Sequence, residues 1–178
     1  MESNNAVADE LASYYGERGF IGWMNSTADS LGMSSTQFAD PSGISPGNVS
    51  TPEDLYRLAA YLTNKKSFIW KISRTPATTL QAEGGASYTF ANFNVFSGLD
   101  TFIGGKVGQT VPAKETMVSV FSIPVAGQTH RIAIIVLQSE DYTSDTGKLK
   151  EWFALASAAG TQAACATCAL PQYRKIPL

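Results

Sequence analysis

One lysine lies in a setting typical of a residue that binds a ligand. The stretch GGKVGQT, residues 104–110, places Lys106 between a glycine pair and a third glycine, at the edge of an apolar run. Because glycine has no side chain to block an approaching molecule, this frame favours a strand across which a ligand lies. On these residues alone, the simpler alternative is a lysine at a sheet edge that discourages aggregation.

The same stretch does not match a phosphate-binding loop. Such a loop requires glycine, four further residues, and then Gly-Lys-Ser/Thr at the start of a helix. Here Asp100 occupies the first glycine position and Val107 follows the lysine. The residues after Lys106 also have the pattern of a strand, so we exclude a phosphate loop.

The beginning of the chain offers a partner for this lysine. Ser3-Asn4-Asn5 forms a Ser-x-Asn triplet immediately before the first apolar-periodic segment. If Lys106 belongs to an active site, the triplet is a candidate for the other side of that site. An ordinary alternative is a helix N-cap, since both residue types favour that position, and the two roles are compatible.

Composition narrows the class of protein. The 178 residues are 44% hydrophobic and 16% charged, which suits one domain with a packed core. A net charge of −2 without a basic block argues against nucleic acid as the main partner. No apolar run approaches the roughly 20 residues of a membrane span, and the polar first residues do not resemble a signal peptide. We expect either a cytoplasmic protein or a sequence that starts after an export signal.

The two cysteines do not make a convincing metal site. Cys165 and Cys168 form a lone CxxC, whereas a zinc site usually has four ligands, and the only histidine, His130, is distant in sequence. We interpret the pair as small apolar residues in a C-terminal tail, with a redox or disulfide role as the weaker alternative. The sequence implies no metal and no cofactor.

The first 75 residues have helical patterns. A helix is predicted from Asn5 to about Tyr15, ending at Gly16, and a second one spans much of residues 17–33. Residues 35–50 are rich in Pro, Gly, Ser and Asn and predict a loop. A helix then starts near Thr51 and Pro52, and residues 65–73 predict a further short one.

From residue 76 the pattern changes to strands. Residues 77–82 and 86–92 predict a hairpin, and residues 101–110, 115–125 and 130–139 predict three sequential strands. Short links between them favour an antiparallel sheet. Residues 143–159 predict an amphipathic helix covering one face, with Leu149, Trp152, Phe153 and Ala156 turned inward. We expect core packing for all three tryptophans, Trp23, Trp70 and Trp152.

Several stretches together resemble a known family. The most specific is FIGWMNSTADSLGMSSTQFADPSGI, residues 20–44, followed by STPEDLYRLA and by ANFNVF with its Asn92 and Asn94. These resemble the serine-type D-Ala-D-Ala carboxypeptidases, which are low-molecular-mass penicillin-binding proteins. The resemblance covers about residues 3 to 157, and GGKVGQT falls where that family has its Lys-Thr-Gly strand. The family uses three motifs, SxxK, SxN and KTG, for acyl transfer. For Asn92 and Asn94 themselves we prefer a role in a turn.

The resemblance implies a role for each matching residue. Ser3 becomes the serine that relays protons, and Asn5 the residue that holds the substrate amide. Lys106 becomes the lysine that supplies positive charge near the substrate carboxylate. Gly108 keeps the strand edge open, and Gln109 lends its backbone N–H to the oxyanion hole.

Two departures from the family matter. Val107 replaces the threonine or serine of the third motif, which removes a hydroxyl that would donate to the substrate carboxylate, a loss of about 1–3 kcal/mol. In addition, no serine in the chain has a lysine three residues later. The closest spacing, Ser67 to Lys71, has one residue too many and follows the SxN triplet, whereas the family's nucleophile precedes it. We therefore expect the nucleophile upstream of Met1.

The resemblance implies an α/β (α+β) fold of the beta-lactamase/transpeptidase type, present only in part. Residues 1–160 would be a partial catalytic domain, with residues 1–75 as its helical part, residues 76–160 as an antiparallel sheet backed by a helix, and residues 161–178 as a tail. The implied function is a D-Ala-D-Ala carboxypeptidase fragment without its nucleophile. The alternatives are a catalytically inactive relative that binds peptidoglycan peptide or a protein partner, and a structural domain.

The resemblance also implies partners and a location. The expected ligands are a peptidoglycan stem peptide ending in D-Ala-D-Ala and beta-lactam antibiotics. A homodimer or a missing N-terminal segment would cover the exposed sheet. The expected location is extracytoplasmic, in the periplasm or at the outer face of the bacterial cell membrane.

Overall fold

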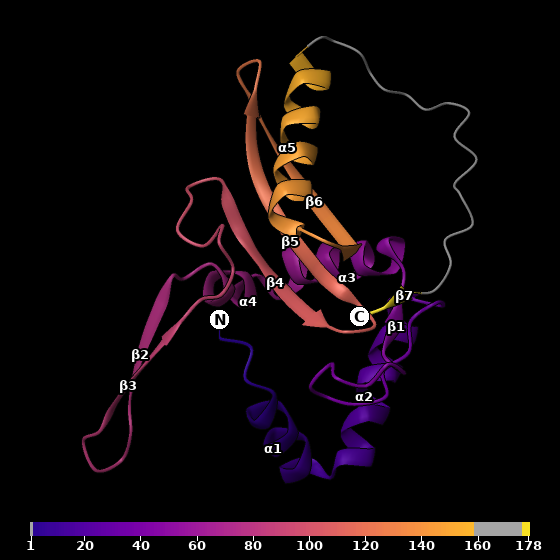
Figure 1. The fold of residues 1–178 in the computed structure, drawn as a ribbon, viewed down its shortest axis with the longest axis vertical. Helices are drawn as coiled ribbons and strands as arrows, with labels where there is room; N and C mark the ends of the chain where they lie inside the picture. The colour runs from indigo at the N-terminus through magenta and orange to yellow at the C-terminus, as the bar shows by residue number, and fades with distance from the viewer. Residues whose placement is uncertain (1, 159–175) are drawn as a thin grey trace.

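The computed structural model describes residues 2–158 and 176–178. The helices are α1 (Asn5–Tyr15), α2 (Glu17–Ser30), α3 (Pro52–Lys65), α4 (Ser67–Ser73) and α5 (Tyr142–Ala158). The strands are β1 (Val49–Ser50), β2 (Ala77–Gln81), β3 (Ser87–Ala91), β4 (Phe102–Thr110), β5 (Lys114–Val125), β6 (Gln128–Ser139) and β7 (Ile176–Pro177). Figure 1 shows α1–α4 below and beside the main sheet, with α5 on its other side. The predicted helices and strands are confirmed, with small shifts at their ends.

Local capping explains where the helices begin. Asn4 caps α1, because its side-chain oxygen accepts a hydrogen bond from the backbone N–H of Val7 at 3.2 Å. Thr51 caps α3 in the same way, through the N–H of Asp54 at 3.2 Å, and Pro52 follows at the first helical position. Between α1 and α2, Gly16 turns the chain with a φ of 82°. The start of α1 thereby fixes the position of the Ser-x-Asn triplet.

The main sheet has three antiparallel strands in the order β4-β5-β6. β5 is central, and a tight turn at Ala126 and Gly127, both with positive φ, joins it to β6. In the register of β4 with β5, Lys106 lies opposite Val118, and Val107 lies opposite Met117. Lys106 therefore lies on an edge strand of this sheet.

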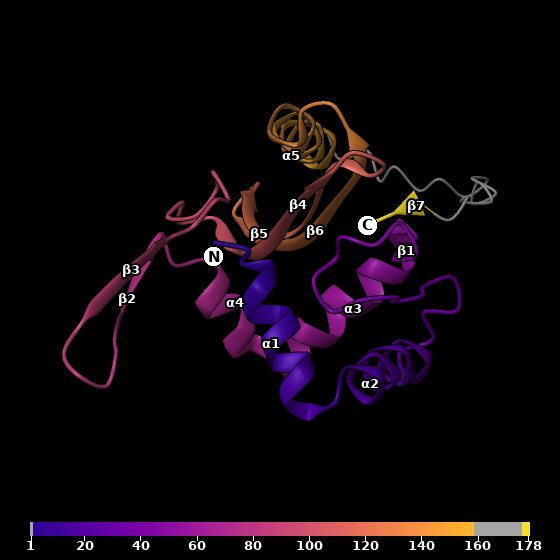
Figure 2. The same ribbon diagram turned by 60° about the horizontal axis from the view of Figure 1, so that its bottom comes forward.

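Each face of the sheet carries its own hydrophobic cluster, with α5 on one side and α3 and α4 on the other (Figure 2). The larger cluster includes Phe96, Phe102, Met117 and Phe121, with Phe153 of α5 packed against it. The smaller cluster consists of Ala59 of α3, Trp70 of α4 and Val120 of β5. The sheet is thus the middle of three layers, which fixes β4 between α4 and the larger cluster.

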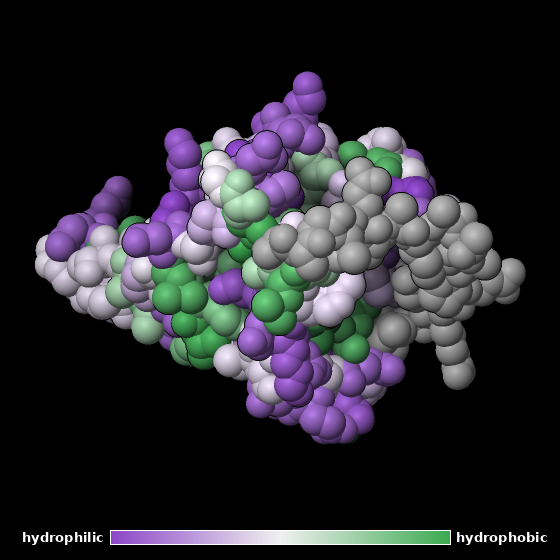
Figure 3. Space-filling model, turned by 90° about the horizontal axis from the view of Figure 1, so that it is seen from above, coloured by the Kyte–Doolittle hydropathy of each residue, from purple (hydrophilic) through white to green (hydrophobic). Residues whose placement is uncertain are grey.

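Two of the tryptophan predictions are wrong. Trp70 is buried, and its indole N–H donates to the Thr63 hydroxyl at 3.0 Å. Trp23 and Trp152, however, are 58% and 60% exposed. The inward face predicted for α5 is also partly wrong, because Leu149 and Trp152 are exposed although Phe153 packs against the sheet. Figure 3 accordingly shows hydrophobic side chains at the surface among hydrophilic ones.

The remaining elements are small. β2 and β3 form the predicted hairpin, which projects away from the main sheet (Figure 1). Asn92 and Asn94 have the predicted turn role, since the Asn92 side-chain oxygen accepts from the N–H of Asn94 and that of Asn94 accepts from the N–H of Phe96. Within the described ranges no helix is long and apolar enough to span a membrane. Cys165 and Cys168 lie outside the described residues.

Candidate active site

The structure brings Ser3 and Lys106 into direct contact. The Lys106 ammonium donates a hydrogen bond to the Ser3 Oγ at 2.8 Å and a second one to the backbone carbonyl of Val107. An ammonium can only donate, so Ser3 must accept, and its own O–H remains free to donate elsewhere. The contact therefore holds the Ser3 hydroxyl next to the Lys106 cation, and the hydroxyl proton can still be donated to another group.

The electrostatic environment affects the lysine more than the serine. Lys106 keeps an exposed surface, yet the surrounding protein desolvates its ammonium, and this burial lowers the pKa of Lys106 below its ordinary value. A cation that is partly stripped of water attracts anions more strongly than a fully hydrated one. The site is therefore suited to an anionic group.

The backbone of Ser3 is in a conformation that is unusual for a residue with a side chain. Its φ is 56°, in the left-handed region that favours glycine. Such conformations cost about 1–3 kcal/mol and are found most often at functional sites, where surrounding contacts hold them. Here the start of α1 at Asn5 on one side and the Lys106 bond on the other hold Ser3 in place.

All six residues proposed from the sequence line one cavity of about 380 Å³. These are Ser3, Asn5, Lys106, Val107, Gly108 and Gln109. Segments far apart in the sequence, the triplet at the start of α1 and the second half of β4, thus form one site. The individual roles that the resemblance assigned to these residues stay predictions.

Sequence reasoning missed one wall of this cavity. Ser42, Gly43 and Ile44, from the loop between α2 and β1, also line it, as does Leu178 after β7. The loop was part of the stretch that carried the resemblance, but its Pro-x-Gly pattern indicates only a turn. No local signal in these residues points to Lys106.

The glycine pair before Lys106 has a different reason from the one expected. A Cβ on Gly104 would lie 2.8 Å from the Cα and from the carbonyl oxygen of Trp70 in α4, and one on Gly105 would lie 2.6 Å from the carbonyl oxygen of Val118 in β5. The pair therefore allows the helix and the neighbouring strand to approach β4 closely. Ser73 strengthens this contact, because its Oγ accepts a hydrogen bond from the Gly105 N–H at 3.1 Å.

Val107 also has a structural explanation. It lines the cavity but is half-buried, and it packs against the larger hydrophobic cluster behind the sheet. A β-branched apolar side chain suits that position, as valine does in most sheets. Where the family motif has a hydroxyl, this chain has an apolar side chain that packs against the larger cluster.

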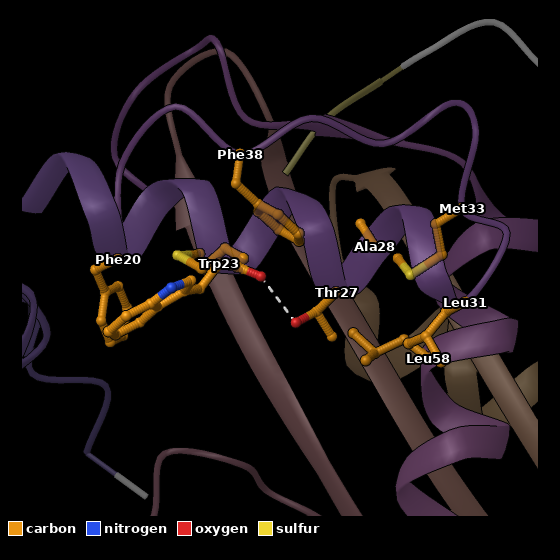
Figure 4. Close-up of a pocket in the computed structure, with 9 residues that line it drawn as sticks. Phe20, Trp23, Thr27, Ala28, Leu31, Met33, Phe38 and Leu58 are labelled. Carbon is orange, nitrogen blue, oxygen red and sulfur yellow. Dashed lines mark hydrogen bonds between the residues drawn. The ribbon is translucent and has the colours of Figure 1, made fainter.

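A second cavity, of about 300 Å³, has a different character (Figure 4). It lies between α2, the loop that follows α2, and α3, and its lining is almost entirely apolar: Phe20, Trp23, Met24, Thr27, Ala28, Leu31, Met33, Phe38 and Leu58. The drawn Thr27 hydroxyl donates to the carbonyl of Trp23 within the same helix, at 2.8 Å. Its lining offers no titratable group, unlike that of the first cavity, which contains Lys106.

Comparisons with curated proteins give a consistent result. The chain is 45% identical over 84 residues to a D-alanyl-D-alanine endopeptidase of Haemophilus influenzae, a match that covers 46% of this chain and 28% of that protein. It is 48% identical over 60 residues to a D-alanyl-D-alanine endopeptidase of Escherichia coli, covering 33% of this chain and 19% of that protein. These matches therefore span less than a third of the curated relatives.

Solved structures extend the likeness to most of the chain. Penicillin-binding protein D2 of Listeria monocytogenes, in a cefotaxime-bound form, superposes with a TM-score of 0.70 and 29% identity, over 84% of this chain and 60% of that one. A D-alanyl-D-alanine carboxypeptidase of Mycobacterium tuberculosis gives a TM-score of 0.67 and 25% identity, over 85% and 59%. The penicillin-binding, transpeptidase-like fold is confirmed.

The family itself matches over a longer stretch than any single curated relative. Residues 1–140 match the peptidase family S11, described as D-alanyl-D-alanine carboxypeptidase, and this range contains the triplet, the 42–44 loop and all of β4. The cavity residues therefore lie inside the matched region, apart from Leu178. The chain belongs to the D-alanyl-D-alanine carboxypeptidase family of serine peptidases.

Proposed function

We propose that this chain forms the proton-relay and anion-binding half of a serine acyl-transfer site that cleaves peptide bonds at D-alanine in peptidoglycan. The observation that carries the proposal is the 2.8 Å hydrogen bond from the Lys106 ammonium to the Ser3 Oγ inside the cavity. Cation and hydroxyl are the two groups that the second and third motifs of this class bring together. Membership of the family supplies the reaction type.

Each residue has a role in this proposal. Lys106 attracts the substrate carboxylate and stabilises the ionised form of the Ser3 hydroxyl, which lowers the pKa of that hydroxyl. Ser3 passes a proton to the departing amine, using the O–H that the lysine bond leaves free. Asn5 holds the substrate amide, Gly108 leaves the strand edge open, and the Gln109 N–H contributes to the oxyanion hole.

The nucleophile is the part that this sequence does not supply. None of its serines is followed by lysine at the spacing of the first motif. We propose that a Ser-x-x-Lys segment outside these 178 residues completes the site, attacks the carbonyl and forms the acyl-enzyme. A segment of the same polypeptide or a partner chain would bring it to the cavity. Among the described residues β4 and β6 each pair with one strand only, and these sheet edges and the exposed apolar side chains offer a surface for such a segment.

Two peptide bonds are candidates for the one that is cleaved: the terminal bond and an internal bond. The family is described by its carboxypeptidases, whereas the two curated relatives are D-alanyl-D-alanine endopeptidases. A carboxypeptidase removes the terminal D-alanine of a stem peptide, and an endopeptidase cuts an internal bond. Both act on cell-wall peptide, so we propose an extracytoplasmic location and beta-lactam antibiotics as covalent inhibitors.

Intact-mass spectrometry after incubation with benzylpenicillin tests this function. We expect one penicilloyl adduct on the product of the complete gene if it includes a Ser-x-x-Lys segment, and none on the 178-residue chain alone. Substitution Lys106→Met in the longer product should slow acylation strongly, whereas Lys148→Met on exposed α5 should not. Labelling of the 178-residue chain would show that a different serine is the nucleophile, and no adduct on either form would refute the enzyme.

A second function is favoured by Val107. Its packing against the hydrophobic cluster and the absent Ser-x-x-Lys motif both fit a catalytically inactive relative that binds peptidoglycan peptide or a protein partner. Such a protein would bind a D-Ala-D-Ala peptide reversibly, form no adduct in any longer form, and release no alanine. The mass measurement and a peptide titration together separate the two functions.

A further inference from the structure

A single carboxylate organises the loop that forms the unpredicted wall of the cavity. Asp40 accepts hydrogen bonds from the Gly43 N–H at 2.5 Å, from the Ser42 hydroxyl at 3.3 Å, and from the Ser45 N–H. Gly43 has a φ of 86°, so the chain can fold back over the carboxylate at that residue. The N–H groups of Gly43 and Ser45 and the Ser42 hydroxyl thus all point to the Asp40 carboxylate, which holds the loop together.

The backbone on the other side of Asp40 is held as firmly. Asn48 is 1% exposed, and its side-chain oxygen accepts from the N–H of Ala39 at 2.8 Å and from that of Asp40 at 3.3 Å. Gly47, next to it, could not carry a side chain, because a Cβ there would lie 2.8 Å from the Cβ of Ala39. Asp40 is thus fixed at its backbone by one residue and fixes its neighbours through its carboxylate.

The charge state of Asp40 agrees with this geometry. Burial alone would raise the pKa of Asp40, but the hydrogen bonds from the backbone N–H groups of Gly43 and Ser45 outweigh it, and the pKa is lowered. The carboxylate is therefore ionised at neutral pH. Hydrogen bonds to an ionised acceptor are about twice as strong as those between neutral groups.

The loop leads directly to the candidate site. Ser42, Gly43 and Ile44 line the cavity that contains Ser3 and Lys106. Ile44 is 55% exposed and lines this cavity, so its side chain is accessible to a molecule bound there. The triplet and β4 supply charged and polar groups to this cavity, whereas Ile44 supplies an apolar surface.

We propose that Asp40 is a positioning residue for substrate binding: it holds residues 42–45 as a wall of the cavity, where Ile44 contacts the alkyl side chain of a D-alanyl peptide. This inference rests on the proposed function, because it takes the ligand from there. Asp40 itself does not touch the substrate. It acts through the backbone of Gly43 and Ser45, and Ile44 is the residue that selects for a small apolar side chain.

Titration of the 178-residue chain with diacetyl-L-lysyl-D-alanyl-D-alanine, followed by amide NMR, tests the inference. In the wild type we expect peptide-induced shifts at Gly43 and Ile44 as well as at Lys106. Substitution Asp40→Asn removes the charge, and should move the amide signals of Gly43 and Ser45 in the free protein and raise the dissociation constant about tenfold. Asp29→Asn, on the exposed side of α2, is the control with the same change in charge and should leave both unchanged.

A second variant covers the case in which Asp40→Asn fails to fold. Ile44→Ser changes only an exposed side chain, should keep the wild-type urea midpoint, and should still weaken peptide binding severalfold. If the wild type binds the peptide and both Asp40→Asn and Ile44→Ser bind it equally well, the inference is wrong while the function stands. If the wild type does not bind the peptide, the inference is wrong, whereas the proposed function is decided separately by the penicilloyl adduct on the complete product.

Discussion

The close approach of α4 to β4 predicts a large effect from one added methyl group. In Gly104→Ala the new Cβ would lie 2.8 Å from the Cα and the carbonyl oxygen of Trp70 and 2.7 Å from the Ser73 Oγ, whereas ordinary contacts begin at 3.4 Å. Two of these atoms belong to the backbone, so rotation of a side chain cannot relieve the overlap. The helix itself must move away from the strand.

The cost follows from what that movement disturbs. Overpacking of this kind costs about 1–3 kcal/mol. Displacement of α4 also stretches the Ser73–Gly105 hydrogen bond, which contributes about 1 kcal/mol, while alanine regains roughly 0.5–1 kcal/mol through the unfolded chain. We therefore expect Gly104→Ala to lower the free energy of unfolding by about 1–3.5 kcal/mol.

Urea denaturation followed by tryptophan fluorescence measures this effect, since Trp70 is buried at the contact. With a slope of about 2 kcal/mol per molar urea, the midpoint should fall by about 0.5–1.8 M. Gly147→Ala in α5 is the matched control, because its Cβ meets nothing within 4 Å. This substitution should raise the free energy of unfolding by about 0.5–1 kcal/mol. A midpoint for Gly104→Ala that stays at the wild-type value, or rises as in the control, would refute the close packing.

Three further predictions concern the site and the helix α3. Because burial lowers the pKa of Lys106, the unfolded chain binds its proton up to a higher pH, so wild-type stability relative to Lys106→Met should rise with pH from that lowered value towards 10.5; urea midpoints that differ by a constant amount across this range would contradict it. Val107→Thr buries a hydroxyl against the larger cluster and should cost about 1 kcal/mol in urea denaturation; an unchanged midpoint together with tighter peptide binding would mean that the side chain faces the ligand. Thr51→Ala removes the cap of α3 and should cost about 1 kcal/mol, measured in the same way, whereas Thr51→Ser should cost much less.

Local signals predicted the helices and strands well. The start of α3 follows from Thr51, Pro52 and two acidic residues within one turn, and all of these act over four positions or fewer. The turn at Ala126 and Gly127 is equally local. Features of this kind are determined by neighbouring residues, so they can be predicted from the sequence.

The site required a different kind of information. Nothing local connects Ser3 to Lys106, and their pairing came from a resemblance that covered both segments. The close packing of the glycine pair was missed for the same reason, because Gly104 meets a helix more than 30 residues earlier in the chain and Gly105 meets β5. Likewise, Asp40 had the signature of an ordinary turn, and only the folded chain places its loop at the cavity. Trp23 and Trp152 were expected in the core because periodicity shows which side chains are apolar and not what covers them.

The bond between Ser3 and Lys106 also has a consequence for the order of folding. Its two groups are 103 positions apart in the chain. Closing so long a loop costs little more free energy than closing one of half the length, only ~0.6 kcal/mol, but contacts of high sequence separation form late. We therefore expect the sheet to be complete before the first residues dock on it. Residues 3–5 would then be among the last to reach their place, and Lys106 would have no Ser3 partner until the sheet was complete.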